Sequence, residues 1–235
     1  MGQKVHPLGF RIAITETWRS RWFADKKTFS VYVIEDYKIR KFVKKNYSQA
    51  GVERIEIERP GENDRDIKLT IRVARVGLLV GRRGERIEQM QEDLEKLTGK
   101  SFQVRLIEVQ EPAISAQLVS EDIATQLQKR QSFRRAMKRA ADAAIDAGAK
   151  GIKMLISGRV GGAEIARREK LIRGSIPLHT LQAHVDYGFT EAPTPYGNIG
   201  IKVWIYRGRN DEESIDGANA QKGQVSKGPK RKIKR

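Results

Sequence analysis

The feature that most constrains the fold of this chain is a pair of alternating segments joined by a turn. Residues 52–59 (VERIEIER) set apolar side chains among charged ones, and residues 66–76 (DIKLTIRVARV) alternate strictly from Ile67 to Val73. A period of two places the apolar side chains on one face of a strand. Between the segments, Pro60–Asp64 has the composition of a turn. The pattern therefore predicts two antiparallel strands that share one buried face.

Further segments complete a first unit around these strands. Residues 34–47 carry apolar side chains on one side and lysines and arginines largely elsewhere, which predicts an amphipathic helix. A short apolar helix is predicted at 75–80, and another helix from Glu85 to a C-terminal cap at Gly99. Residues 101–109 are predicted to form a third strand.

A second unit follows. Pro112 opens a helix, and a long basic helix is predicted from Lys129 to about Ala147. A short helix is predicted at 163–169, and strands at 181–189 and 198–208. Because both units mix helices with short strands and Gly/Pro turns, each is predicted to be an α+β domain.

These elements divide the chain into four predicted parts. A basic arm at 1–16 precedes a domain at 17–110, and a second α+β domain follows at 111–208, with the long basic helix packed on a small, mostly antiparallel sheet. The tail at 209–235 ends in a stretch with seven basic residues and no acid from Gln221 onward. Such a tail cannot bury a core and is predicted to be disordered.

The charge balance narrows the class of partner. The chain has 46 lysines and arginines against 29 acids, a net charge of +17, and a pI near 10.1. An excess of this size favours a polyanion such as nucleic acid. No apolar run approaches the roughly 20 residues that a membrane span needs, and the N-terminus lacks an apolar signal core. We therefore expect a cytoplasmic protein without a membrane partner.

Two arginines between glycines, Gly81-Arg82-Arg83-Gly84, stand directly before the helix predicted at Glu85. A helix N-terminus presents unpaired N–H groups, and glycine allows a phosphate backbone to approach closely. Taken alone, such a segment is more often a plain turn. Here the order helix, strand, strand, short helix, glycine loop, helix, strand is that of a type II KH domain. In that setting the loop is predicted to hold single-stranded nucleic acid.

Basic residues also gather in the second unit. Residues 129–139 (KRQSFRRAMKR) hold six of them, with no acid before Asp142. If Arg130, Arg134 and Lys138 lie on one helix, they form a stripe that no local ion pair neutralises. A solvated helix face is the ordinary explanation, but the net charge favours an RNA contact. Residues 157–169 set arginines around a glycine turn, which suits a surface hairpin equally well.

Enzyme and metal signatures have little support. TGKS at 98–101 lacks the glycine that a phosphate-binding loop needs and ends a predicted helix. His179 and His184 lie five apart in a predicted strand, on opposite faces, so a shared metal is not expected. The chain has no cysteine, which excludes disulfides and zinc–cysteine sites. We expect no catalytic residue, metal or cofactor.

Longer motifs carry a resemblance to a known family. They run from MGQKVHPLGFR at the N-terminus through VARVGLLVGRRGE, QLQKRQSFRRAMKRA and GAKGIKMLISGRVGGAEIAR to YGNIGIKVWIYRG, roughly residues 1–208. The glycine loop is generic to KH domains, whereas FRRAMKRA and SGRVGGAEIAR are far more specific. In these motifs the chain resembles the bacterial-type small-ribosomal-subunit protein three family. It departs from the pattern in PGENDRD and in the tail.

The resemblance implies a structural component of the small-subunit head. Such a protein binds 16S-type ribosomal RNA, mainly through its second domain and its arm, and neighbours small-subunit proteins ten and fourteen. It also implies that Arg134, Arg135 and Lys138 line the channel through which messenger RNA enters, where they assist passive unwinding. Further basic residues are expected to bind ribosomal RNA: Lys4, Arg11, Lys129, Arg130, Arg139, Arg159, Arg167 and Arg168.

Two other functions remain open at this point. A free-standing KH regulator would discriminate among single-stranded sequences, because base edges carry sequence information and phosphates do not. It would not need the second domain. An RNA-processing enzyme such as a nuclease would need positioned carboxylates or histidines, and no such pair stands out in the predicted loops.

Overall fold

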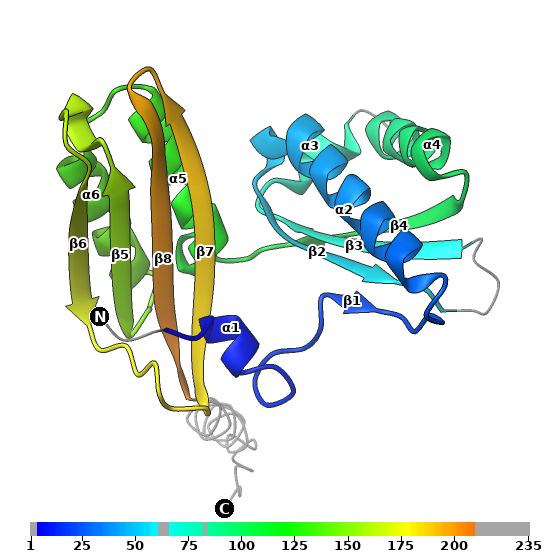
Figure 1. Cartoon of the computed structure of the whole chain (residues 1–235), viewed down its shortest axis with the longest axis horizontal. Helices are drawn as coiled ribbons and strands as arrows, with labels where there is room; N and C mark the ends of the chain where they lie inside the picture. The colour runs from blue at the N-terminus through cyan, green and yellow to red at the C-terminus, as the bar shows by residue number, and fades with distance from the viewer. Residues whose placement is uncertain (1–3, 61–65, 82–83, 210–235) are drawn as a thin grey trace, which may run out of the picture.

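Two sheets, each flanked by helices, make up the fold (Figure 1). The computed structural model describes residues 4–60, 66–81 and 84–209. The predicted α+β class and the two-domain organisation are confirmed. The predicted turn lies largely, and the tail almost entirely, outside the described residues.

The first sheet has the order β1-β2-β3-β4. Its strands are β1 (Ser20–Arg21), β2 (Val52–Glu58), β3 (Asp66–Val73) and β4 (Ser101–Glu108). β2 and β3 are antiparallel, as predicted, with Ile57 opposite Leu69 and Ile55 opposite Ile71. β4 is parallel to β3, so the chain must cross over between them.

Helices cover one face of this sheet, and they include the crossover. They are α2 (Phe29–Asn46), α3 (Val76–Val80) and α4 (Glu85–Thr98), with a 3₁₀ turn at Ser48–Ala50. α2 begins at Phe29, earlier than predicted. The prediction missed the first turn because apolar side chains are exposed there, so the turn shows no amphipathic pattern. The core between helices and sheet includes fully buried Ile39, Val43, Ile57, Leu69, Ile71, Leu79, Met90 and Leu94.

The second sheet has the order β6-β5-β8-β7 and is antiparallel throughout. Its strands are β5 (Gly151–Gly158), β6 (Arg167–Gly174), β7 (Ala183–Thr194) and β8 (Gly197–Arg209), with 3₁₀ turns at Pro112–Ile114 and Val160–Gly162. Two helices, α5 (Ala116–Gln128) and α6 (Phe133–Asp146), lie on one face (Figure 1). Their apolar sides meet the alternate strand residues Ile152, Met154, Ile156, Ile201, Val203 and Ile205.

Two helix predictions in this domain are wrong. The long helix predicted from Lys129 begins only at Phe133, because α5 runs to Gln128 and Arg130 takes a left-handed backbone with φ 58° that interrupts the helix. The short helix predicted at 163–169 does not form either. β6 begins at Arg167 instead, since pairing with β5 satisfies its backbone groups.

The arm is fastened to the second sheet by a buried guanidinium. The arm contains a short helix, α1 (Pro7–Phe10), followed by Arg11, whose side chain is fully buried. Arg11 donates to the carbonyls of Ala183 (2.8 Å), Pro7 (3.0 Å) and Thr180 (2.9 Å), and also to those of Pro177 (3.0 Å) and Leu178 (3.1 Å). These carbonyls come from the arm, from β7 and from the loop that precedes it. Arg11 therefore ties three segments together.

Charged side chains also link the two domains. Glu16 accepts from Arg54 of β2 at 3.0 Å and lies 3.3 Å from Nε2 of His184 on β7. Arg207 of β8 lies 3.8 Å from Glu53 of β2. Glu16, in the segment that leads into the first sheet, therefore bridges a strand of each sheet, and the contact between Arg207 and Glu53 joins the two sheets directly.

Replacing Glu16 with Gln should lower stability in a pH-dependent way. Burial raises the pKa of Glu16, but the hydrogen bond from His184 and the charge of Arg54 outweigh it and bring the pKa to about 2, below its ordinary value of 4.5. A depressed carboxyl pKa stabilises the fold above the unfolded-state value and loses that effect as the pH falls through the folded value. The free-energy difference between wild type and Glu16→Gln should therefore be full near neutral pH and should shrink between about 4.5 and 2.

Urea unfolding followed by circular dichroism at several pH values measures that difference. Glu92→Gln is the matched control, since Glu92 is an exposed carboxylate on α4 that pairs with the exposed Lys96 and should change stability little at any pH. A wild-type advantage over Glu16→Gln that stayed constant down to the lowest pH would contradict the assigned role of the carboxylate.

Candidate RNA-binding surfaces

The first turns of α6 display a group of unpaired cations. Arg134, Arg135, Lys138 and Arg139 are all exposed. Ala136, Met137, Ala141 and Ala144 are buried, on the opposite side of the helix. Within the described part of the chain, none of the four cations forms an ion pair with an acid.

Their position on the helix is costly for stability. A helix N-terminus already carries partial positive charge, so cations in the first turn are unfavourable there and acids are favourable. α6 has no acid in its first turn, and Arg134 and Arg135 stand in it. The combined charges of helix end and guanidinium groups make this end of α6 strongly attractive to an anion.

An aromatic ring organises part of this group. The guanidinium carbon of Arg134 lies 5.5 Å from the ring centroid of Phe133, and that of Arg167 on β6 lies 5.9 Å from the same ring. Cation–π contacts of this kind restrain the flexible arginine side chains. Phe133 thus brings a cation of β6 next to the cations of α6. Sequence reasoning missed this role, for which the only signal was an aromatic residue within a basic run.

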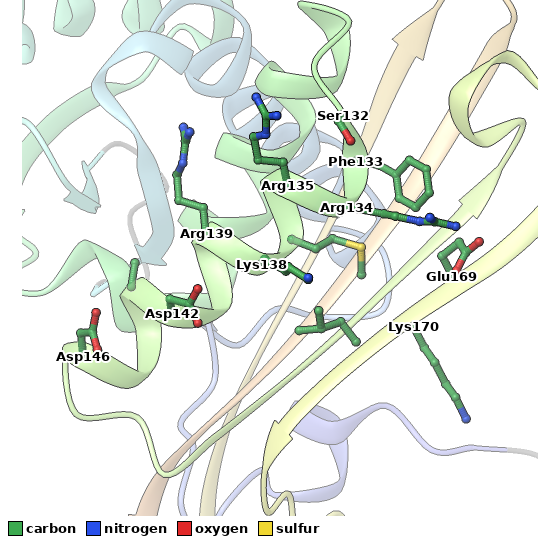
Figure 2. A pocket seen from close by; sticks show the side chains of 13 residues that line it. Ser132, Phe133, Arg134, Arg135, Lys138, Arg139, Asp142, Asp146, Glu169 and Lys170 are labelled. Atoms are coloured by element: carbon green, nitrogen blue, oxygen red, sulfur yellow. The ribbon is translucent and has the colours of Figure 1, made fainter.

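Helix and strand enclose an open groove of about 780 Å³ (Figure 2). Arg135 and Arg139 project to one side of α6, while Arg134 lies over β6 near Glu169. Asp142 also lines the groove, but it pairs with Arg173 of β6. The groove is therefore positively charged at the N-terminal end of α6, while two acids, Asp142 and Asp146, line it toward the C-terminal end.

Lys129 and Arg130 lie apart from that helix. Both are exposed in the turn between α5 and α6, and neither is among the residues that line the groove. The predicted stripe of Arg130, Arg134 and Lys138 is therefore wrong in its first member, because the left-handed Arg130 precedes the helix instead of belonging to it.

The glycine loop has the backbone that glycine is needed for. Gly81 has φ 68° and Gly84 has φ 90°, and Gly84 stands directly before α4 as its N-cap residue. A Cβ on Gly81 would lie 2.8 Å from Cγ of Arg86, whose guanidinium donates to the carbonyl of Leu78 at 2.8 Å. Arg86 thus packs across the turn. Arg82 and Arg83, predicted to contact RNA, lie outside the described residues.

The other predicted RNA-binding residues have different surroundings. Lys4, Arg167 and Arg168 are exposed, and Arg159 is half-buried, where it donates to Ala163 and Tyr196 and holds the turn after β5. Arg11 is the exception. Because its guanidinium is fully buried among backbone carbonyls, the predicted RNA contact of Arg11 is not compatible with its position.

The candidate enzyme and metal features do not assemble into a site. Thr98 and Gly99 end α4, with Gly99 as its left-handed cap, so TGKS does not precede a helix. His179 lies in the loop before β7, and His184 contacts Glu16. Residues 4–60, 66–81 and 84–209 contain no group of three or more metal-ligating side chains. Within the same residues, no helix is long and apolar enough to cross a bilayer.

Comparison with known proteins accounts for both domains. The model of the KH domain matches residues 38–114, and the model described as the C-terminal domain of ribosomal protein S3 matches residues 123–205. Small ribosomal subunit protein uS3 of Rhodopirellula baltica is 52% identical over 240 residues, covering 100% of both chains. The chain belongs to the ribosomal protein S3 family. The uS3 protein of Caldicellulosiruptor saccharolyticus is also 52% identical, over 95% of this chain and 99% of that one.

Family membership decides the class of function. Ribosomal protein S3 is a structural protein of the small subunit, so the chain is a ribosome-associated, cytoplasmic component and not an enzyme. Its KH domain makes it an RNA-binding protein. The resemblance stated from the motifs is thereby confirmed.

Proposed function

We propose that this chain binds small-subunit ribosomal RNA and holds messenger RNA where it enters the subunit. The observation that carries the second part is the set of exposed, unpaired cations at the N-terminal end of α6, beside an open groove. A single strand offers its phosphates at close spacing, and Arg134, Arg135 and Lys138 would neutralise them.

Such a site would assist unwinding without consuming a nucleotide. A surface that binds single-stranded RNA better than duplex favours the open state of a hairpin by the difference in binding free energy. The ribosome's own movement along the message then prevents the strands from closing again. This mechanism suits a chain whose TGKS segment ends a helix and so offers no phosphate-binding loop.

The KH loop would provide a second contact with single-stranded RNA. Its left-handed glycines precede α4, so N–H groups at the start of that helix are available to a phosphate. We assign this loop, Gly81–Gly84, to the domain at 17–110 and the basic helix to the domain at 111–208.

Ribosomal RNA would contact the remaining exposed cations and hold the protein in the head. These are Lys4, Lys129, Arg130, Arg139, Arg167 and Arg168, with Arg159 holding the turn beside them. Small-subunit proteins ten and fourteen are the expected neighbours. Contacts with ribosomal RNA and with those proteins together predict an attachment that does not depend on charge alone.

Sedimentation of a native lysate tests this function directly. We expect the chain in stoichiometric amount in small subunits and whole ribosomes at moderate salt, and we expect it to remain there at high salt. A protein that binds only through phosphates would dissociate as salt rises, because binding constants fall steeply with salt concentration. Migration near the top of the gradient would instead favour a free-standing KH regulator.

A further inference from the structure

The second sheet has a face that no long helix covers. α5 and α6 both lie behind the sheet in Figure 1, and α1 covers only one end of the near face, beside β7 and β8. On each strand, the residues that alternate with the core residues therefore point away from α5 and α6 along most of the sheet.

Strand register arranges these outward residues in rows. The first row across β6, β5, β8 and β7 is Ile172, Lys153, Trp204 and Tyr187. The second row is Lys170, Leu155, Lys202 and Phe189, and the third is Arg168, Ser157, Gly200 and Glu191. Lysines and aromatic rings thus alternate over two neighbouring rows, and neither row contains an acid.

Within each row, lysine side chains and aromatic rings lie close together. Nζ of Lys153 lies 5.1 Å from the Trp204 ring, and Nζ of Lys202 lies 5.9 Å from the Phe189 ring. The rings of Tyr187 and Trp204 are 5.4 Å apart. Phe189 is 42% exposed, so its large apolar ring faces solvent.

The cations of this face also repel one another. Burial lowers the pKa of Lys153, and the charges of Lys4 and Lys170 lower it further. Lys4 belongs to the arm, so arm and sheet bring their charges together at this edge. A polyanion would relieve the repulsion, whereas a basic or neutral partner would not.

We propose that this sheet face, defined by Lys153, Lys170, Lys202, Tyr187, Phe189 and Trp204, binds a single-stranded segment of RNA. A base would stack on the exposed ring of Phe189, beside the half-buried ring of Trp204, and the lysines would contact the phosphates. A four-stranded sheet with outward aromatic residues is a recurring platform for single-stranded RNA. Successive rows lie roughly 7 Å apart, so Phe189 and Trp204 are offset from one another along the strands.

The face is separate from the groove beside α6. Arg167 and Arg168 are adjacent in sequence but point to opposite sides of the sheet, since Arg167 contacts Phe133 of α6 and Arg168 lies in the outward third row. One RNA segment can therefore occupy each side. The inference rests on the proposed RNA-binding function and adds a site, with residues that the motifs did not indicate.

Binding of a fluorescent uridine oligonucleotide to the full-length chain tests the proposal. Phe189→Ala should weaken binding about 5-fold or more, the loss expected for one stacked base. Phe23→Ala is the control, because Phe23 is 93% exposed on the first domain and should leave the affinity unchanged. Lys153→Gln with Lys202→Gln should make the slope of log affinity against log salt shallower by about 1.4, or about 0.7 for each lost phosphate contact.

Crosslinking of the unsubstituted chain gives an independent result that does not depend on a variant folding. An oligonucleotide containing 4-thiouridine should crosslink to peptides that carry Phe189 or Trp204. Unchanged affinity for Phe189→Ala, together with crosslinks confined to α6 and the glycine loop, would overturn the proposal.

Charge reversal on α6 in the same assay separates this inference from the broader function. If reversal at Arg134, Arg135 and Lys138 weakens binding and the sheet variants do not, the sheet proposal alone fails. If neither set has an effect, RNA binding by the second domain fails as a whole.

Discussion

Reversing three charges on α6 should reduce the affinity of the chain for single-stranded RNA by about 100-fold or more at about 0.1 M salt. Each phosphate contact on a single strand contributes a salt-dependent factor of roughly 5 at that concentration, and three contacts multiply. The variant Arg134→Glu/Arg135→Glu/Lys138→Glu also places acids in the first turns of the helix, where they favour helix formation. A loss of binding would therefore not be explained by a loss of the fold.

In reconstituted translation, ribosomes that carry the same variant should pause longer at a stable hairpin in the message. Passage through an unstructured message should not change, which makes that message the internal control. Arg134→Lys/Arg135→Lys keeps the charges while changing the shape of the donors. If charge is the cause, ribosomes with this variant should pass the hairpin nearly as fast as wild type. Equal passage of both variants and wild type through the hairpin would remove the proposed role in unwinding.

Replacing Arg11 with Met should destabilise the protein by on the order of 3–5 kcal/mol. The side chains are similar in length, but Met cannot donate to the carbonyls that Arg11 satisfies. A buried acceptor left without a donor costs roughly 1–3 kcal/mol, and part of that cost is recovered where water reaches the site. Arg11→Lys should also be destabilising, because an ammonium group has fewer donors and cannot span the same acceptors.

Urea unfolding measures the effect of Arg11→Met. Arg168→Met is the control, since Arg168 is exposed and its loss should change stability by no more than about 0.5 kcal/mol. Limited proteolysis should also cut the arm of the Arg11 variant sooner than that of wild type. A change in unfolding free energy below about 1 kcal/mol would show that the arm is held mainly by other contacts.

The elements with strong periodicity could be predicted closely. β2, β3 and α4 appear where alternation and helical spacing place them, and Gly99 ends α4 with the expected left-handed backbone. The region from Lys129 to Glu169 could not be predicted as well. A basic run has helical propensity on either side of Arg130, so only the packing of α5 and α6 on one sheet decides where the chain turns.

Arginines were the residue type whose roles sequence alone could not separate. Arg11, Arg159 and Arg168 are equally basic in the sequence, yet one is buried, one holds a turn and one faces outward from the sheet. A guanidinium group can donate to carbonyls, stack on rings or face solvent, and its surroundings decide which. Charge counts could therefore predict an RNA partner but not the residues that meet it.

The sequence by itself determined the class of the fold, the family and the need for a polyanionic partner, because periodicity, long motifs and net charge are local or additive properties of the chain. Only the tertiary structure decided which cations are free, because burial and pairing join residues distant in sequence, as Arg11 and Ala183 are joined. Strand register likewise created the aromatic and basic face of the second sheet, whose members come from four separate strands. No single segment contains that pattern, so it exists only once the strands are paired.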